Sequence, residues 1–280
     1  MQSVIPILRS TVTIMTPLLF AAVAGLFPAL AGTLNIALEG LLLAGAFSAL
    51  AVFHLTGSAV LAIISAICAA LSLSVLHAFA AFKLRANLFI TGLAVNLLSS
   101  VLCIVISDKL FNTRGVVASQ NIPGLLKWYL IAGLFLLFAS WLVIYKTPFG
   151  FRLRSCEKNS EALISLGISP LFYQTTALLL SGVFCGIGGS FLSLNLGAFV
   201  PGLPAGKGWI ALVVVFLGGR KPLGVLAAAF VFALADAFSI HAQGLWNIPA
   251  DFILAFPYVC TLIAMIAVSV VPVRKLFNIN

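Results

Sequence analysis

A glutamate and an asparagine stand in an otherwise apolar stretch near the N-terminus. Residues 32–47 read GTLNIALEGLLLAGAF, with Asn35 and Glu39 four positions apart. An ionisable side chain that faces lipid costs at least about 2.5–3.5 kcal/mol on insertion scales, so we expect Glu39 to face the protein interior, a cavity or a partner. If the stretch is helical throughout, the spacing places both side chains on one face.

Two roles are open for this pair. Asn35 and Glu39 either satisfy backbone groups that a break in the helix leaves free, or they contact a hydroxylated substrate. The second role is chemically sensible because a carboxylate accepts hydrogen bonds from hydroxyl groups.

Other polar residues also occur in or beside apolar runs. They are Asn87, Thr91, Asn96, Asn195, Trp209 and Asp236. For the first three, bonding to a neighbouring helix is the alternative to a place on a transport path. Asn195 precedes the Gly/Pro-rich segment GAFVPGLPAGKGW, and discontinuous helices of this kind form transport sites. Trp209 either anchors the membrane interface or stacks on a ring, whereas we expect Asp236 to be structural.

The composition indicates that a membrane surrounds these residues. Of the 280 residues, 62% are hydrophobic and only 8% are charged, and the mean hydropathy is +1.23. A soluble domain carries about 25% charged residues, and the sequence has no long polar stretch to build one. The net charge of +9 comes from residues in short loops. That distribution is typical of membrane orientation signals and argues against nucleic-acid binding.

The apolar runs predict an all-α polytopic membrane protein with about 8–10 transmembrane helices, some broken or re-entrant. We expect a single transmembrane domain over residues 1–280. The runs are 10–31, 34–53, 57–82, 88–107, 124–145, 172–198, 209–219, 222–240 and 251–273. Because a bilayer core needs about 20 apolar residues per helix, the run 209–219 is too short to cross alone.

Lysine and arginine predict the orientation of the helices. Most of them lie in the segments 83–86, 146–161, 219–222 and 274–280. We therefore place these segments on the cytoplasmic side, which makes the C-terminus cytoplasmic.

The longest hydrophilic segment covers about residues 146–170. Pro148 and Gly150 are expected to end the preceding span. Ser160 is expected to cap a short helix with Glu161 in its first turn. The residues alone leave two alternatives, a solvated loop or a cytoplasmic helix on which a soluble partner acts.

Four patterns follow one another along the chain. They are GTLNIALEGLLLAGAF (32–47), ANLFITGLAVNLL (86–98), RSCEKNSEALISLGIS (154–169) and GKGWIALVVVFLGGRKPLGVLAAAFVFALADAF (206–238). In this order and spacing the chain resembles permease subunits of bacterial ABC importers, in the branched-chain amino acid/ribose-like branch. The simple-sugar and nucleoside permeases that work with a lipoprotein are most similar. Ser160 and Leu163 depart from the proline and alanine that are usual in the third pattern.

This resemblance implies a fold like that of type II ABC importers and a role for the third pattern. Its helix would be the coupling helix received by an ATP-binding subunit. The docking candidates are Glu157, Asn159, Glu161, Ala162 and Gly167. The resemblance also implies a second, longer permease subunit and an extracytoplasmic substrate-binding protein or lipoprotein as partners.

The function expected from this resemblance is that of a multi-pass permease subunit in a bacterial cytoplasmic (inner) membrane. The expected solute is a nucleoside, with a simple sugar or a riboflavin-like vitamin next. The substrate-path candidates are Asn35, Glu39, Asn87, Thr91, Asn96, Asn195 and Trp209. The alternatives are a secondary transporter driven by an ion gradient and, third, a membrane-embedded enzyme.

Motifs for independent chemistry are missing from the sequence. AGKG at 205–208 lacks the spacing and the hydroxyl of a phosphate-binding loop. We therefore expect no enzyme activity and no cofactor in this chain, with ATP and Mg²⁺ on a partner subunit. The five cysteines form no CxxC and no Cys/His cluster, so no metal site is expected. Cys156, in the polar loop, is expected to be a free cytoplasmic thiol.

Overall fold

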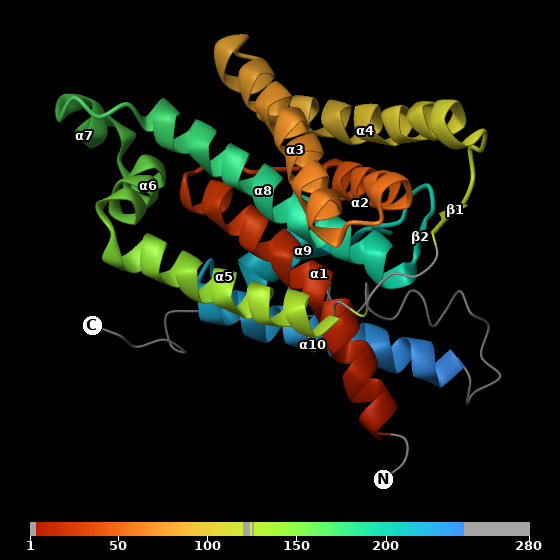
Figure 1. The fold of residues 1–280 in the computed structure, drawn as a ribbon. Helices are drawn as coiled ribbons and strands as arrows, with labels where there is room; N and C mark the ends of the chain where they lie inside the picture. Colours follow the sequence, from red (N-terminus) through yellow and green to blue (C-terminus); the bar gives the residue numbers. More distant parts are fainter. Residues whose placement is uncertain (1–3, 120–123, 125, 244–280) are drawn as a thin grey trace.

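A computed structural model of the chain shows a bundle of long helices (Figure 1). The structure describes residues 4–119, 124 and 126–243. Seven of the described helices are long and apolar enough to cross a membrane. They are α1 (Val4–Leu30), α2 (Leu38–Thr56), α3 (Ala59–Ala78), α4 (Leu88–Phe111), α5 (Leu126–Lys146), α8 (Pro170–Leu196) and α10 (Pro222–Gln243). The prediction of an all-α polytopic membrane protein is confirmed, and the run 251–273 lies outside the described residues.

Short elements join these spans. α9 (Lys207–Leu217) has 11 residues, which cover about 16 Å and therefore about half of a bilayer core. The π-helix η1 (Phe79–Lys83) continues α3. Two-residue strands β1 (Val117–Ala118) and β2 (Ala198–Phe199) pair antiparallel.

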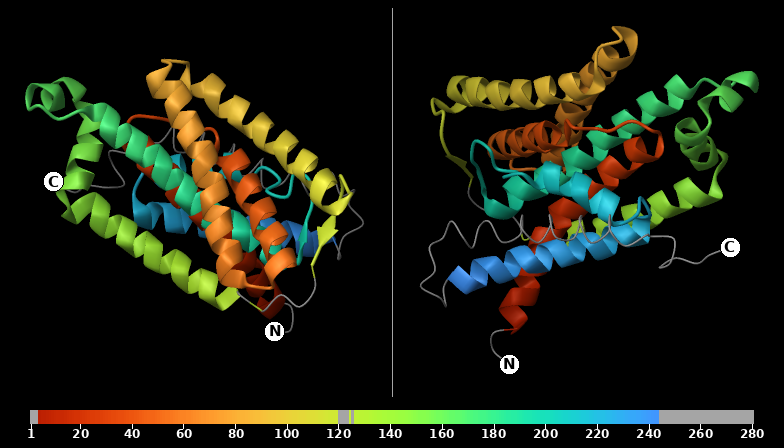
Figure 2. Two further views of the ribbon diagram at one scale, coloured as in Figure 1. Left: turned by 45° about the horizontal axis from the view of Figure 1, so that its top comes forward. Right: turned by 180° about the vertical axis from the view of Figure 1, so that it is seen from behind.

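Three helices form the centre of the bundle. In each of α1, α2 and α8, at least 72% of the most apolar 18-residue stretch is buried inside the protein. In each of α3, α4 and α5, the buried share of that stretch is at most 28%. Figure 2 shows α3 and α4 on one side of this centre and α5 and α10 on the other. The peripheral helices therefore present their apolar side chains to lipid or to a partner subunit.

Glycines allow the central helices to approach closely. A Cβ added at Gly189 of α8 would lie 2.3 Å from the carbonyl oxygen of Leu42 in α2. One added at Gly186 would lie 2.6 Å from the Cα of Ile67 in α3. Such spacing lets helix backbones touch, as is common where small residues line a membrane-helix interface.

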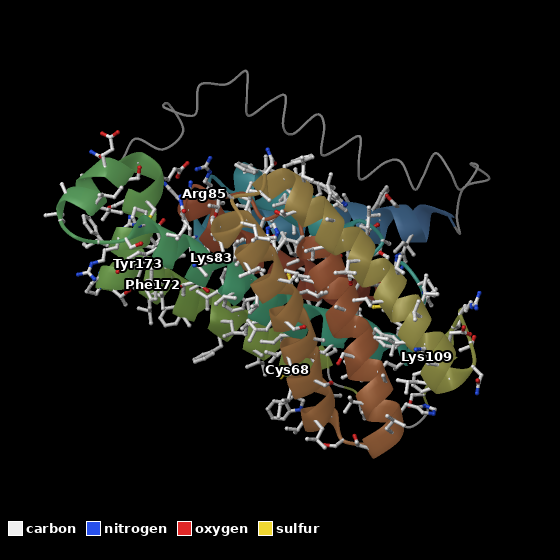
Figure 3. All side chains as sticks on the ribbon, turned by 90° about the horizontal axis from the view of Figure 1, so that it is seen from above. Cys68, Lys83, Arg85, Lys109, Phe172 and Tyr173 are labelled. Carbon is white, nitrogen blue, oxygen red and sulfur yellow. The ribbon has the colours of Figure 1, made fainter. Side chains whose placement is uncertain are left out.

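The two ends of the bundle carry different loops. One end holds α6 (Pro148–Lys158) and α7 (Ser160–Ser165); we call it the α6–α7 end. Figure 3 shows Lys83 and Arg85 toward this end, with Phe172 and Tyr173, whereas Lys109 lies at the opposite end. The described basic segments 83–86, 146–161 and 219–222 thus lie toward one end, whereas the segment 274–280 lies outside the described residues.

The segment 146–170 contains two helices where the sequence predicted one. Pro148 does not merely end a span, because it is the first residue of α6, which Thr147 caps. Proline suits this position since it needs no backbone donor there. The prediction that Ser160 caps α7 is wrong. Asn159 Oδ1 instead accepts an N–H of the first turn at 3.0 Å, and asparagine and serine are equally good cap residues.

Candidate functional site

Glu39 binds the N-terminus of the half-length helix α9. Its Oε1 accepts the N–H of Gly206 at 2.8 Å, and its Oε2 accepts the N–H of Gly208 at 2.7 Å. The first amides of a helix have no partner within the helix, and a negative charge is favoured beside them. This geometry fits the first of the two roles considered for Glu39, in which the carboxylate satisfies a broken helix.

Two glycines make this contact sterically possible. Gly206 caps α9 with φ at +82°, a conformation that suits glycine. A Cβ at Gly208 would lie 2.4 Å from the backbone nitrogen of Glu39. Any larger residue at position 208 therefore requires α9 and α2 to move apart.

Asn35 and Glu39 do not share a helical face, and that prediction is wrong. Gly32 takes a φ of +74° after α1 ends, and α2 begins only at Leu38, so Asn35 lies in the non-helical segment between them. Asn35 Oδ1 accepts the N–H of Ala37 at 3.0 Å. The Asn35 side chain is fully buried, and its Nδ2 has no partner among the described residues.

Asn96 of α4 holds the start of α2. Its Oδ1 accepts the N–H of Gly40 at 2.7 Å, and its Nδ2 donates to the carbonyl of Ile36 at 2.9 Å. Ser99 Oγ donates to the carbonyl of Gly40 at 2.7 Å. Asn96 therefore bonds a neighbouring helix and satisfies the backbone on both sides of the point where α2 begins.

The other path candidates do not join this cluster. Asn87 caps α4, and the Thr91 hydroxyl bonds two carbonyls of the same turn at 3.1 Å each. Asn195 is exposed near the C-terminal end of α8. Trp209, in the first turn of α9, is 43% exposed. Asn87, Asn195 and Trp209 are thus the path candidates that stay accessible.

The other end of α9 is tied to α6. Arg220 lies in the turn that follows α9 and forms an ion pair with Glu157 of α6. The Arg220 guanidinium also lies over the Phe216 ring, 5.2 Å from its centroid. The backbone of Glu157 approaches Gly32, where an added Cβ would lie 3.1 Å from its Cα. One short helix is therefore held at both ends, by α2 at one end and by α6 at the other.

A pocket of about 270 Å³ opens beside this ion pair. It is lined by residues of α1, of α6, of the segment after α1 and of the α9 end. Cys156 at its wall is a free thiol, as predicted, but it is only 4% exposed. Burial raises the pKa of the Cys156 thiol, so the reactive thiolate is disfavoured.

α7 presents the remaining docking candidates to the outside. Asn159, Glu161, Ala162 and Gly167 are exposed, and only Leu163 of this short helix is buried. Two apolar residues that the sequence analysis did not single out are also exposed there. They are Ile164, at 63%, and Leu166, at 73%. Because they lie outside every candidate span, a protein partner rather than lipid is expected to cover them.

Comparison with known proteins decides the family. Residues 7–269 match the family described as "Branched-chain amino acid transport system / permease component". The chain belongs to this permease family. It is similar to the guanosine ABC transporter permease NupQ of Bacillus subtilis, with 31% identity over 92% of this chain and 90% of that protein. The nucleoside ABC transporter permease NupC of Lactococcus lactis is 30% identical over 89% and 88%.

A solved structure shares the fold. PsaBC from Streptococcus pneumoniae, in complex with a Fab, superposes with a TM-score of 0.56. The match covers 92% of this chain and 91% of that chain at 13% identity. At such low identity the match concerns the fold alone.

Membership of the family identifies the chain as a multi-pass permease subunit of an ABC transporter, which is not itself an enzyme. Such subunits work with ATP-binding subunits and with a protein that supplies the substrate. The alternative of a secondary transporter driven by an ion gradient is not favoured.

Proposed function

We propose that this chain forms half of the translocation path of an importer for nucleosides. The support is that two relatives similar over nearly their whole length are named for guanosine and for nucleosides. A simple sugar and a riboflavin-like vitamin are the next candidates. In this proposal a second, longer permease subunit completes the path, and a substrate-binding protein or lipoprotein delivers the solute. The chain itself holds no cofactor, and its partner subunits bind ATP and Mg²⁺.

The proposed location is the bacterial cytoplasmic (inner) membrane, with the α6–α7 end in the cytoplasm. The basic residues at this end support that orientation, because lysine and arginine favour the cytoplasmic side. Lys83, Lys146 and Arg220 all lie at or beside its loops. The C-terminus is then cytoplasmic as well.

The tether of α9 at both ends supports a mechanism for this importer. An ATP-binding subunit docks on α7 and moves the α6–α7 end. The Glu157–Arg220 ion pair passes this movement to α9, and the Glu39 carboxylate passes it from α9 to α2. Both contacts are made at the ends of α9, which is a single short helix. A movement of α6 at the cytoplasmic end is therefore passed along α9 to α2 in the middle of the membrane.

The solute is proposed to pass beside the N-terminus of α9. The exposed Trp209 offers a ring on which a nucleobase can stack, and Asn195 offers an amide. Asn35, Asn96 and Glu39 then shape the path through the backbone contacts described above, with Asn87 and Thr91 at the cytoplasmic start of α4.

Docking on α7 is tested by co-expression with the ATP-binding subunit of the same transporter. Replacing Leu166 with aspartate is expected to lower the amount of co-purified ATP-binding subunit about tenfold, because an exposed apolar anchor becomes a charge. Val116 is a matched control, since it is 58% exposed and precedes β1 at the other end. Val116→Asp should leave the co-purified amount unchanged.

The same preparation tests the energy source and the solute. In proteoliposomes that also hold the binding protein, guanosine uptake should require a hydrolysis-competent ATP-binding subunit and should survive an ionophore. Uptake that persists with the ATPase inactivated, and collapses with the ionophore, would show that the proposed function is wrong.

A further inference from the structure

Three cations lie along the corner between α5 and α6, and none of them has an acidic partner among the described residues. Lys146 is the last residue of α5, and Arg152 and Arg154 follow on α6. Within the part of the chain that the structure describes, none of them forms an ion pair with a carboxylate. Glu157, the acidic residue of the same short helix, is engaged by Arg220. The corner therefore carries uncompensated positive charge.

Each of these cations contacts an aromatic side chain. The Lys146 ammonium lies over the Trp141 ring at 5.9 Å, and the Arg154 guanidinium lies over the Tyr145 ring at 4.9 Å. Arg152 donates to the Tyr173 hydroxyl at 3.1 Å. A guanidinium has five N–H donors, and these contacts use few of them, so each arginine keeps donors for an anion.

An apolar surface adjoins the charged corner. α5 is one of the least buried spans, and its outward side chains include Phe135 at 66% and Phe138 at 56% exposed. Phe172 at the start of α8 is 62% exposed. Tryptophan and tyrosine favour the level of the lipid headgroups, and Trp141 and Tyr145 lie between the apolar surface and the cations. The corner thus matches a molecule with an anionic head and an apolar tail.

We propose that the α5–α6 corner binds an anionic phospholipid. The phosphate lies between Lys146 and Arg154, whose ring partners Trp141 and Tyr145 are neighbours on α5 with centroids 6.4 Å apart, and the acyl chains lie along the outer face of α5. Arg152, two positions from Arg154, lies on another face of α6 beside Tyr173. The lipid is favoured over a soluble phosphate compound because the cations border an exposed membrane-facing surface instead of a closed pocket. Since α6 also carries Glu157, the bound lipid holds the helix through which α9 is tied. The proposal needs only the membrane location of the chain, so it stands independently of the proposed solute.

Lipid binding is tested on the transporter complex purified in a neutral detergent. Titration with phosphatidylglycerol is expected to raise its melting temperature, whereas phosphatidylcholine and inorganic phosphate at equal concentration should not. A cation near an anionic lipid contributes a factor of about five in affinity. The double variant Lys146→Gln, Arg154→Gln should therefore bind phosphatidylglycerol about 25-fold more weakly. Arg154→Gln alone, which is less disruptive should the double variant fail to fold, should bind it about fivefold more weakly.

The same helix supplies a matched control. Lys127 is exposed in the first turn of α5, beside the exposed Trp128 and far from the corner. Lys127→Gln should retain the full response to phosphatidylglycerol. An equal response to phosphatidylcholine, a response to inorganic phosphate, or a full response in Arg154→Gln would overturn the proposal. So would a response that appears only when the ATP-binding subunit is removed, because the corner would then belong to that protein interface.

Discussion

Replacing Glu39 with alanine is expected to abolish uptake and to lower the melting temperature of the purified permease. The substitution leaves the N–H groups of Gly206 and Gly208 without their acceptors. Gly208 is buried and Gly206 half-buried. A buried donor without a partner costs about 1–3 kcal/mol, and the lost charge at the helix N-terminus adds about 0.3–2 kcal/mol. The total is a large share of the about 5–15 kcal/mol by which folded proteins are typically stable.

Glutamine at position 39 should give an intermediate result, because one oxygen remains while the amide nitrogen faces a donor. Thermal unfolding in detergent and uptake in cells measure the two effects. Glu161→Gln, an exposed change on α7, controls for loss of a carboxylate and should not alter the melting temperature. If Glu39→Gln melts like the unchanged protein and loses only uptake, Glu39 contacts the solute or gates the path.

Replacing Gly208 with alanine should have a comparable effect through steric overlap. The added methyl group would lie 2.4 Å from the nitrogen and 2.7 Å from the Cα of Glu39. Neither backbone atom can rotate away, so α9 has to shift and the bonds to the carboxylate lengthen. Overpacking of this kind costs about 1–3 kcal/mol, and uptake should fall with it.

Gly115 provides a matched control for this experiment. At Gly115, an added Cβ would approach only one side-chain oxygen, at 3.8 Å. Gly115→Ala should therefore match the unchanged protein in melting temperature and in uptake. Full uptake by Gly208→Ala would show that the close contact between α9 and α2 is not required for transport.

The positions of the long helices were predictable from the sequence because each membrane span needs a run of about 20 apolar residues. The run 88–107 corresponds to Leu88–Phe111, and the run 222–240 corresponds to Pro222–Gln243. The short run 209–219 appears as α9, which is too short to cross. α6 was missed because a polar helix beside a membrane lacks the apolar signal on which the prediction depended.

The partners of the polar residues could not be predicted. The sequence indicates that Glu39 needs an interior partner, yet that partner is backbone N–H lying 167 and 169 positions away. Likewise, nothing in the local sequence joins Glu157 to Arg220, 63 positions further on. A break in the helix near Asn35 was one of the two alternatives considered, but the sequence did not show that α2 begins only at Leu38.

Transmission of movement from α6 to α9 is tested most directly by reversing the charges of the Glu157–Arg220 ion pair. A partly exposed ion pair contributes about 0–1 kcal/mol, while like charges at the same positions repel. Glu157→Arg and Arg220→Glu should therefore each lower ATP-dependent guanosine uptake about threefold to tenfold, at unchanged protein level. The double variant restores an opposite pair and should recover most of the uptake, which a double-mutant cycle quantifies. Unimpaired single variants, or a double variant no better than either of them, would contradict this coupling between α6 and α9.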